Sequence, residues 1–77
     1  MLIYSDEHAS GYTLQVHRYT RPADARQLYR ATVRDPDGRV TDTAMFYREE
    51  PALVWGGRRY RRRHSPHGIP RPARTTD

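Results

Sequence analysis

The chain has 77 residues, of which fourteen are arginine and none is lysine or cysteine, and its formal net charge is +5. This length allows one domain, because a chain this short buries only about 60% of its unfolded surface on folding. The absence of cysteine excludes disulfides, thiolate zinc sites and cysteine nucleophiles. Only eleven residues are leucine, isoleucine, valine or phenylalanine, so we expect a thin core supplemented by six tyrosines and one tryptophan.

Charge is distributed unevenly along the chain. Residues 1–50 hold seven arginines and eight acids, a balance of −1, whereas residues 51–77 hold seven arginines and one acid, a balance of +6. This asymmetry predicts an acidic partner for the C-terminal part, with nucleic acid as the first candidate. No stretch has the length and apolar character of a secretory signal or a transmembrane helix, so we expect a cytoplasmic protein with no membrane partner.

The first predicted elements are two strands. Residues 12–17 alternate between apolar and polar side chains, which predicts a strand with Tyr12, Leu14 and Val16 on one face. We expect residues 2–4 to pair with it across a loop that ends at Gly11. Residues 21–27 are ambiguous, and at most one helical turn is expected at residues 23–26.

The strongest local signal is a turn, with the sequence Arg34-Asp35-Pro36-Asp37-Gly38-Arg39. Proline presets φ for a type I turn, and the glycine accepts the positive φ that follows, so the segment predicts a three-residue hairpin loop with a G1 bulge. The simplest register pairs Val33 with Thr41, Ala31 with Thr43 and Tyr29 with Met45. It predicts one buried face made of Tyr29, Ala31, Val33, Thr41, Thr43, Met45 and Tyr47.

A second hairpin is predicted at Gly56-Gly57, a dipeptide that suits a type I′ turn. It would join residues 52–55, with Trp55 as the core anchor, to residues 58–61. The arginine-rich segment that begins at residue 58 would form an edge strand that leaves the sheet. Together the elements predict a mainly β fold: a curled antiparallel meander or open barrel of five to six strands over residues 1–63, with at most one short helix. Residues 64–77, rich in proline and arginine, are expected to form a flexible basic tail.

The arginine-rich segment is the main candidate site. Five guanidinium groups in six residues match a phosphate backbone, with further contacts from the tail and with tyrosines available to stack on bases. The candidate contacts to nucleic acid or to an acidic partner are Arg58, Arg59, Tyr60, Arg61, Arg62, Arg63, Arg71 and Arg74, and the candidate stacking residues are Tyr47 and Tyr29. Two simpler interpretations stay open: a charged edge strand that prevents aggregation, and tyrosines that fill the core.

No catalytic or metal-binding arrangement is evident in the sequence. His64 and His67 have a chelating spacing but no nearby carboxylate, while His8 lies beside two acids in an incomplete set. His17 falls on the polar face of its strand. We therefore expect neither an enzyme nor a cofactor.

Two hypotheses for the function follow. The first is a small module that binds nucleic acid, mainly through phosphate contacts. The second is a compact inhibitor or adaptor, of the class found in phages and mobile elements, including anti-CRISPR and other anti-defence proteins, that docks on an acidic or nucleic-acid-binding surface of a host protein. A homodimer formed by pairing of exposed strand edges is a third arrangement that the sequence leaves open.

Overall fold

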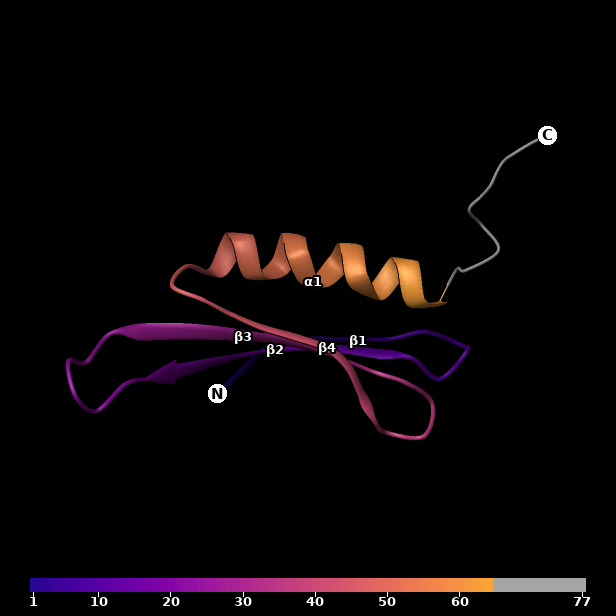
Figure 1. The fold of residues 1–77 in the computed structure, drawn as a ribbon, viewed down its shortest axis with the longest axis horizontal. Helices are drawn as coiled ribbons and strands as arrows, with labels where there is room; N and C mark the ends of the chain where they lie inside the picture. The colour runs from indigo at the N-terminus through magenta and orange to yellow at the C-terminus, as the bar shows by residue number, and fades with distance from the viewer. Residues whose placement is uncertain (65–77) are drawn as a thin grey trace.

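A computed structural model describes residues 1–64 of the chain. Figure 1 shows a sheet seen nearly edge-on, with one helix lying across one of its faces. The elements follow in chain order: β1 (Leu2–Glu7), β2 (Thr13–Thr20), β3 (Gln27–Arg34), β4 (Val40–Phe46) and α1 (Glu49–His64).

The four strands form one antiparallel sheet in the order β1-β2-β3-β4, so every strand pairs with its neighbour in sequence. The predicted mainly β class and the antiparallel meander are confirmed, but the sheet is open and has four strands. The predicted hairpin at Gly56-Gly57 and the limit of one short helix are wrong, because residues 49–64 form a single helix of 16 residues. Within the described part of the chain, helix α1 is the only element that covers the sheet, and it covers one face.

The helix forms because charge and packing favour it at both ends and along one side. Glu49 and Glu50 lie in its first turn and three arginines in its last, which matches the helix dipole at each end. Pro51 falls in the first turn, where its missing N–H removes no intrahelical hydrogen bond. The two adjacent glycines cost about 2 kcal/mol of helix propensity relative to alanine. Their pairing therefore predicted a turn, and only contact with the sheet explains why the helix continues through them.

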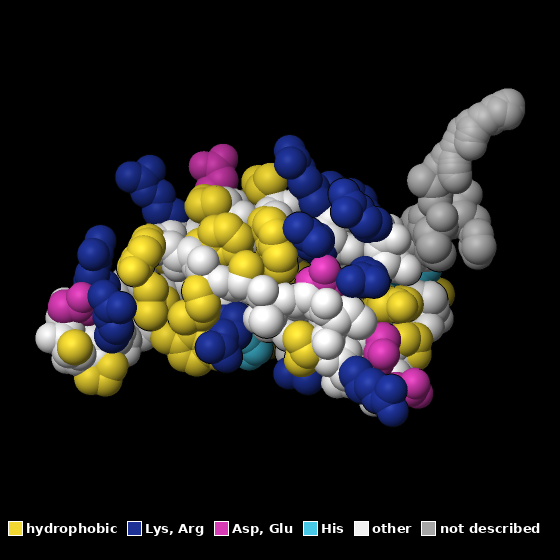
Figure 2. Space-filling view, viewed as in Figure 1, with side chains coloured by type: hydrophobic (Ala, Val, Ile, Leu, Met, Phe, Trp, Pro, Cys, Tyr) yellow, Lys and Arg dark blue, Asp and Glu magenta, His cyan; other side chains and the backbone are white. Residues whose placement is uncertain are grey.

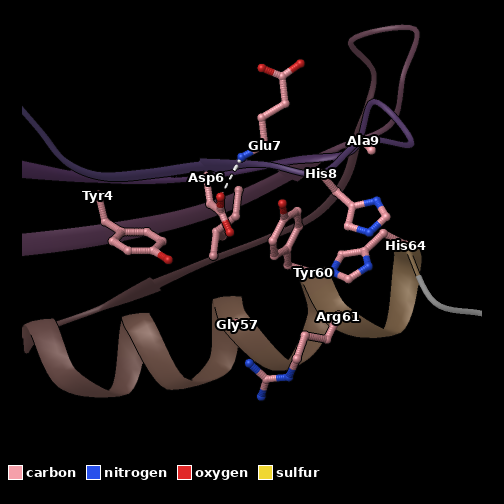
Figure 3. A pocket seen from close by; sticks show the side chains of 10 residues that line it. Tyr4, Asp6, Glu7, His8, Ala9, Gly57, Tyr60, Arg61 and His64 are labelled. Atoms are coloured by element: carbon pink, nitrogen blue, oxygen red, sulfur yellow. Dashed lines mark hydrogen bonds between the residues drawn. The ribbon is translucent and has the colours of Figure 1, made fainter. Parts of the chain in front are cut away.

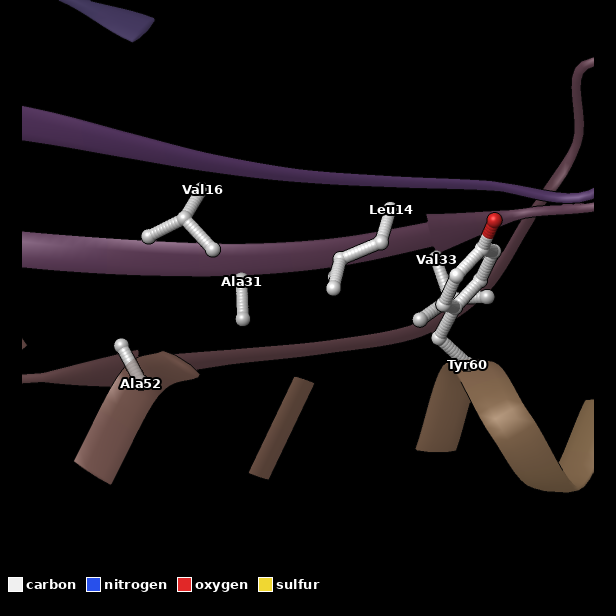
Figure 4. Close-up of a cluster of buried hydrophobic side chains, with 6 residues drawn as sticks. All are labelled: Leu14, Val16, Ala31, Val33, Ala52 and Tyr60. Carbon is white, nitrogen blue, oxygen red and sulfur yellow. The ribbon is translucent and has the colours of Figure 1, made fainter. Parts of the chain in front are cut away.

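The core lies between the helix and the two central strands, as Figure 4 shows. Its buried side chains are Leu14, Val16, Ala31, Val33, Ala52 and Tyr60. Gly56 is buried between Ala52 and Tyr60, and a Cβ atom built on it would lie 2.9 Å from Cδ1 of Leu14 and 3.2 Å from Cβ of Ala31. Gly56 thus allows the helix to approach the sheet closely. The predicted anchor, Trp55, is half-buried beside this core and contacts the Phe46 ring, with the centroids 5.8 Å apart.

The predicted turn between β3 and β4 is confirmed. Gly38 has φ of 87°, and the Asp35 side chain accepts hydrogen bonds at 2.9 Å from the backbone N–H groups of Asp37 and Arg39. Arg34 pairs with Val40 as expected from this loop.

The register beyond this turn differs from the prediction. A second irregularity follows at once, so that Val33 pairs with Asp42 and Ala31 with Ala44. Thr41 is the extra residue, and its hydroxyl lies 2.8 Å from the Asp42 carboxylate. The bulge reverses the predicted faces of β4: Asp42, Ala44 and Phe46 face the helix, while Thr43 and Met45 face away.

The first two strands pair as predicted, and Gly11 in their loop has φ of 100°. The sequence allowed at most one helical turn at residues 23–26, and the structure has a turn here, closed by a hydrogen bond from the Ala25 N–H to the Arg21 carbonyl at 2.7 Å. Ala25 has φ of 58°, so the turn does not continue into a helix, and Asp24 accepts hydrogen bonds from the side chain of Arg21 and the backbone of Arg26. These interactions hold the pKa of Asp24 at about 2, with the hydrogen bond from Arg21 as the main cause.

The predicted tail, residues 64–77, lies outside the described residues except for His64, which ends α1. Across residues 1–64, no helix combines the length and the apolar character needed to cross a membrane.

Candidate nucleic-acid interface

The predicted arginine cluster lies on the C-terminal half of α1 and not on a strand. Figure 2 shows arginine side chains gathered over this half of the helix. Arg58, Arg61 and Arg62 are exposed, and their spacing places them on the side opposite the buried stripe of Ala52, Gly56 and Tyr60. None of the three forms an ion pair with an acid of residues 1–64. We call Arg58, Arg61 and Arg62 the outer arginines.

Arg59 and Arg63 have a different environment, because they flank the helix face that meets the sheet. The Arg63 Nε atom donates to Asp42 Oδ1 at 2.8 Å, and an Arg59 nitrogen lies 3.6 Å from Asp42 Oδ2. The Arg59 guanidinium also lies over the Trp55 ring, 5.2 Å from its centroid. Asp42 therefore interacts with both arginines and connects the end of the helix to β4.

The Asp42 carboxylate is only 6% exposed. Burial by itself would raise its pKa, but the hydrogen bonds from Arg63 and Thr41 and the positive charges of Arg63 and Arg59 outweigh burial. The net result is a lowered pKa for Asp42, which keeps this side chain ionised at neutral pH.

Tyr60 belongs to the core. It is 6% exposed and faces the sheet, so its ring offers little surface on which a base could stack. Burial raises the pKa of Tyr60, and the neighbouring Asp6 carboxylate raises it further. The ring also packs edge-on against His64, with centroids 4.6 Å apart.

His64 joins the end of the helix to the loop between β1 and β2. Its ring stacks on that of His8, with centroids 3.9 Å apart and an interplanar angle of 11°. Burial lowers the pKa of His64, and the neighbouring His8 lowers it further, so the uncharged form of His64 is favoured. In the loop, His8 Nδ1 accepts a hydrogen bond from the Ser10 backbone N–H at 3.0 Å, which places the proton of neutral His8 on Nε2.

The histidine pair borders a hollow of about 450 Å³ between β1, the β1–β2 loop and the helix (Figure 3). Arg61 lies at its rim, so the hollow adjoins the outer arginines. Asp6 and Glu7 also line it and give it mixed charge. This balance makes the hollow a weaker phosphate site than the outer surface of the helix.

The two predicted stacking tyrosines do not form one platform. Tyr29 is half-buried and packs against the core on the helix side of the sheet. Tyr47 follows β4, is 57% exposed, and has the Arg26 guanidinium 4.8 Å from its ring centroid. Arg71 and Arg74 lie outside the described residues.

Sequence reasoning missed three residues that the structure makes prominent. The predicted register left Asp42 off the buried face, because the bulge at Thr41 has no strong signal of its own. Tyr19 and Arg30 lie beside each other on the face of the sheet away from the helix, with the Arg30 guanidinium 5.6 Å from the Tyr19 ring centroid. The alternation of residues 13–19 and the β2–β3 register would have placed them together.

Comparisons with protein-family models, with curated proteins and with solved structures found no match. Among residues 1–64, no three histidine or acidic side chains come together in a way that could hold a metal ion.

Proposed function

We propose that the protein is a non-enzymatic module that binds nucleic acid through the outer arginines of α1. The observation that carries this proposal is the position of Arg58, Arg61 and Arg62: three guanidinium groups on one exposed helix surface, without an acidic partner in the described part of the chain. Guanidinium binds phosphate with two parallel hydrogen bonds and is weakly hydrated, so it suits a phosphate backbone.

The contrast with Arg59 and Arg63 supports this assignment. Those two arginines are held by Asp42, and their contribution to the fold accounts for their presence. A favourable interaction with the helix dipole needs only one or two cations in the last turn, whereas Arg58 lies more than a turn from the end of the helix. The outer arginines are left for a partner.

Binding of this kind depends on the charge and spacing of the phosphates and does not depend on the base sequence. It weakens steeply as salt rises, because each neutralised phosphate releases condensed counterions. The basic character of the whole chain would further speed the encounter with a polyanion.

The test is the affinity for a labelled 20-nucleotide oligonucleotide, measured by fluorescence polarisation at 0.1 M salt. A triple variant with Arg58, Arg61 and Arg62 replaced by glutamine should bind about 100-fold more weakly, from three lost phosphate contacts. The matched control replaces Arg26, Arg39 and Arg48, which are also exposed, and removes the same charge from elsewhere. Equal losses in the two variants, or no binding by the unchanged protein, would contradict the proposal.

The second hypothesis, docking on an acidic protein surface, uses the same arginines but predicts a different result. Purification of the tagged protein from a lysate with and without nuclease separates them. Under our proposal the copurifying material disappears after nuclease treatment. Retention of one protein in a fixed ratio, lost in the variant that lacks the outer arginines, would favour the inhibitor or adaptor function.

A further inference from the structure

The sheet face away from the helix is not covered by any element of residues 1–64 (Figure 1). Side chains on this open face alternate with the buried ones of β2 and β3, and the register extends the set to the outer strands. The central part of the open face comprises Gln15, His17, Tyr19, Leu28, Arg30, Thr32, Arg34, Thr43 and Met45.

Four of these side chains form a continuous surface across three strands. On β2 the rings of His17 and Tyr19 are 6.1 Å apart and inclined by only 26°. The Arg30 guanidinium of β3 lies 5.6 Å from the Tyr19 ring centroid, and its Nε atom lies 3.4 Å from the Met45 sulfur of β4. Tyr19 and Met45 are nonetheless 40% and 45% exposed. A tyrosine ring with a guanidinium group over it is thus partly exposed to solvent.

Beside this surface lies a hollow of about 420 Å³ between β3 and β4. Thr32 is part of its lining and is 7% exposed, and its hydroxyl has no hydrogen-bond partner among residues 1–64. Buried hydroxyl groups are normally paired, so the Thr32 hydroxyl is available to a polar atom of water or of a ligand that enters the hollow. Arg30 and Arg34 stand on either side of Thr32, about 13 Å apart at the usual rise of a strand.

The positive charge of the open face favours a polyanion as its binding partner. Its central strands carry Arg30 and Arg34 and no acid, and the register places Glu7 of the edge strand β1 on the same face. A second copy packed face to face would bring these arginines toward their counterparts without acids between them. A polyanion would neutralise them, and its unpaired bases would meet the aromatic and guanidinium surfaces on which bases stack.

We propose that the open face is a second contact surface, which binds unpaired bases of a single-stranded nucleic acid. The inference rests on the proposed function and adds a class of ligand to it: bases stack on Tyr19 and Arg30, one base edge hydrogen-bonds to Thr32, and phosphates pair with Arg30 and Arg34. Duplexes, whose bases are stacked inside, would use the outer arginines alone. The two surfaces lie on opposite sides of the sheet, so their contributions should be independent.

The experiment compares the affinity for a single-stranded 12-mer with the affinity for the duplex of the same length. Tyr19→Leu keeps apolar bulk and removes the stacking face, so it should weaken single-strand binding by at least about 5-fold and leave duplex binding unchanged. Thr32→Val, which keeps the shape of the side chain, should weaken single-strand binding by about 2- to 10-fold. The matched control is Tyr4→Leu, at a tyrosine of similar exposure (44%) on the helix side of β1.

The outcomes separate this inference from the proposed function. If the unchanged protein binds both oligonucleotides and the Tyr19 and Thr32 variants bind them equally well, the open face is not a base-binding surface and only the inference fails. If the unchanged protein binds neither, the proposed function fails and the inference fails with it. A concentration-dependent dimer in sedimentation, abolished by Tyr19→Leu, would assign the open face to a second copy and would also overturn the inference.

Discussion

Replacing Gly56 with alanine tests the contact between helix and sheet. Two opposing effects determine the result. Alanine stabilises a helix interior by about 1 kcal/mol relative to glycine. The new methyl group would lie 2.9 Å from Leu14 Cδ1 and 3.2 Å from Ala31 Cβ, both in the closed core. Overpacking of a filled core costs about 1–3 kcal/mol, so the net expectation is a loss of stability of about 0–2 kcal/mol.

Gly57 is the matched control. A Cβ atom there meets only the tip of the Arg61 side chain, at 3.3 Å, and that flexible group can move aside. Gly57→Ala should therefore stabilise the protein by about 1 kcal/mol, which corresponds to a rise in Tm of about 4–8 °C. The two variants share the same gain in propensity, so their difference of about 1–3 kcal/mol reports the packing cost alone.

The assay is urea unfolding followed by the fluorescence of Trp55, the only tryptophan, with thermal unfolding by circular dichroism as a second measure. Equal stabilisation by both alanines would show that the helix does not approach the sheet at Gly56. Destabilisation by both would indicate positive φ at these positions, as in the type I′ turn that the sequence predicted, and would refute the helix itself.

Two further predictions concern side chains that hold the end of the helix. Asp42→Asn should lower the free energy of unfolding by about 1–2 kcal/mol in urea titrations, because the buried charge that binds two half-exposed arginines is lost. A change below about 0.3 kcal/mol, the error of the method, would argue against the ion pairs. His64 has a lowered pKa in the folded protein, so the unfolded chain binds its proton more tightly. The contribution of His64 to the free energy of unfolding should therefore be complete above pH 6.5, the ordinary histidine pKa, and decrease as the pH falls toward the folded pKa. Urea midpoints at pH 7.5 and pH 5.5 should show this fall in the unchanged protein and a smaller one in His64→Gln, and equal falls would contradict it.

The sheet was more predictable from sequence than the helix. The alternation of residues 12–17 and the proline–glycine turn at residues 34–39 are local signals, and both match the structure. Residues 49–64 carry local signals that conflict with one another. The terminal charges favour a helix, but Gly56-Gly57 favours a turn. The conflict is resolved by a long-range contact with Leu14 and Ala31 that no local pattern contains.

The composition predicted which arginines form the candidate site, but only the fold shows how their side chains are arranged. The arginine cluster was visible in the sequence, whereas its division into outer arginines and a pair bound to Asp42 depends on helical periodicity. The pairing also depends on the bulge at Thr41, which turns Asp42 toward the helix and Met45 toward the open face. One extra residue in a strand thus affects both candidate surfaces, and a simple two-residue alternation could not reveal it.

The salt dependence of binding tests the proposed function most directly. The logarithm of the affinity for duplex DNA should fall linearly with the logarithm of the salt concentration. Replacing the three outer arginines with glutamine should reduce the magnitude of the slope by about 2.7, or about 2 for a single strand. The Tyr19 variant should keep the full slope. An unchanged slope after loss of the outer arginines would show that they make no phosphate contacts and would contradict the proposed function.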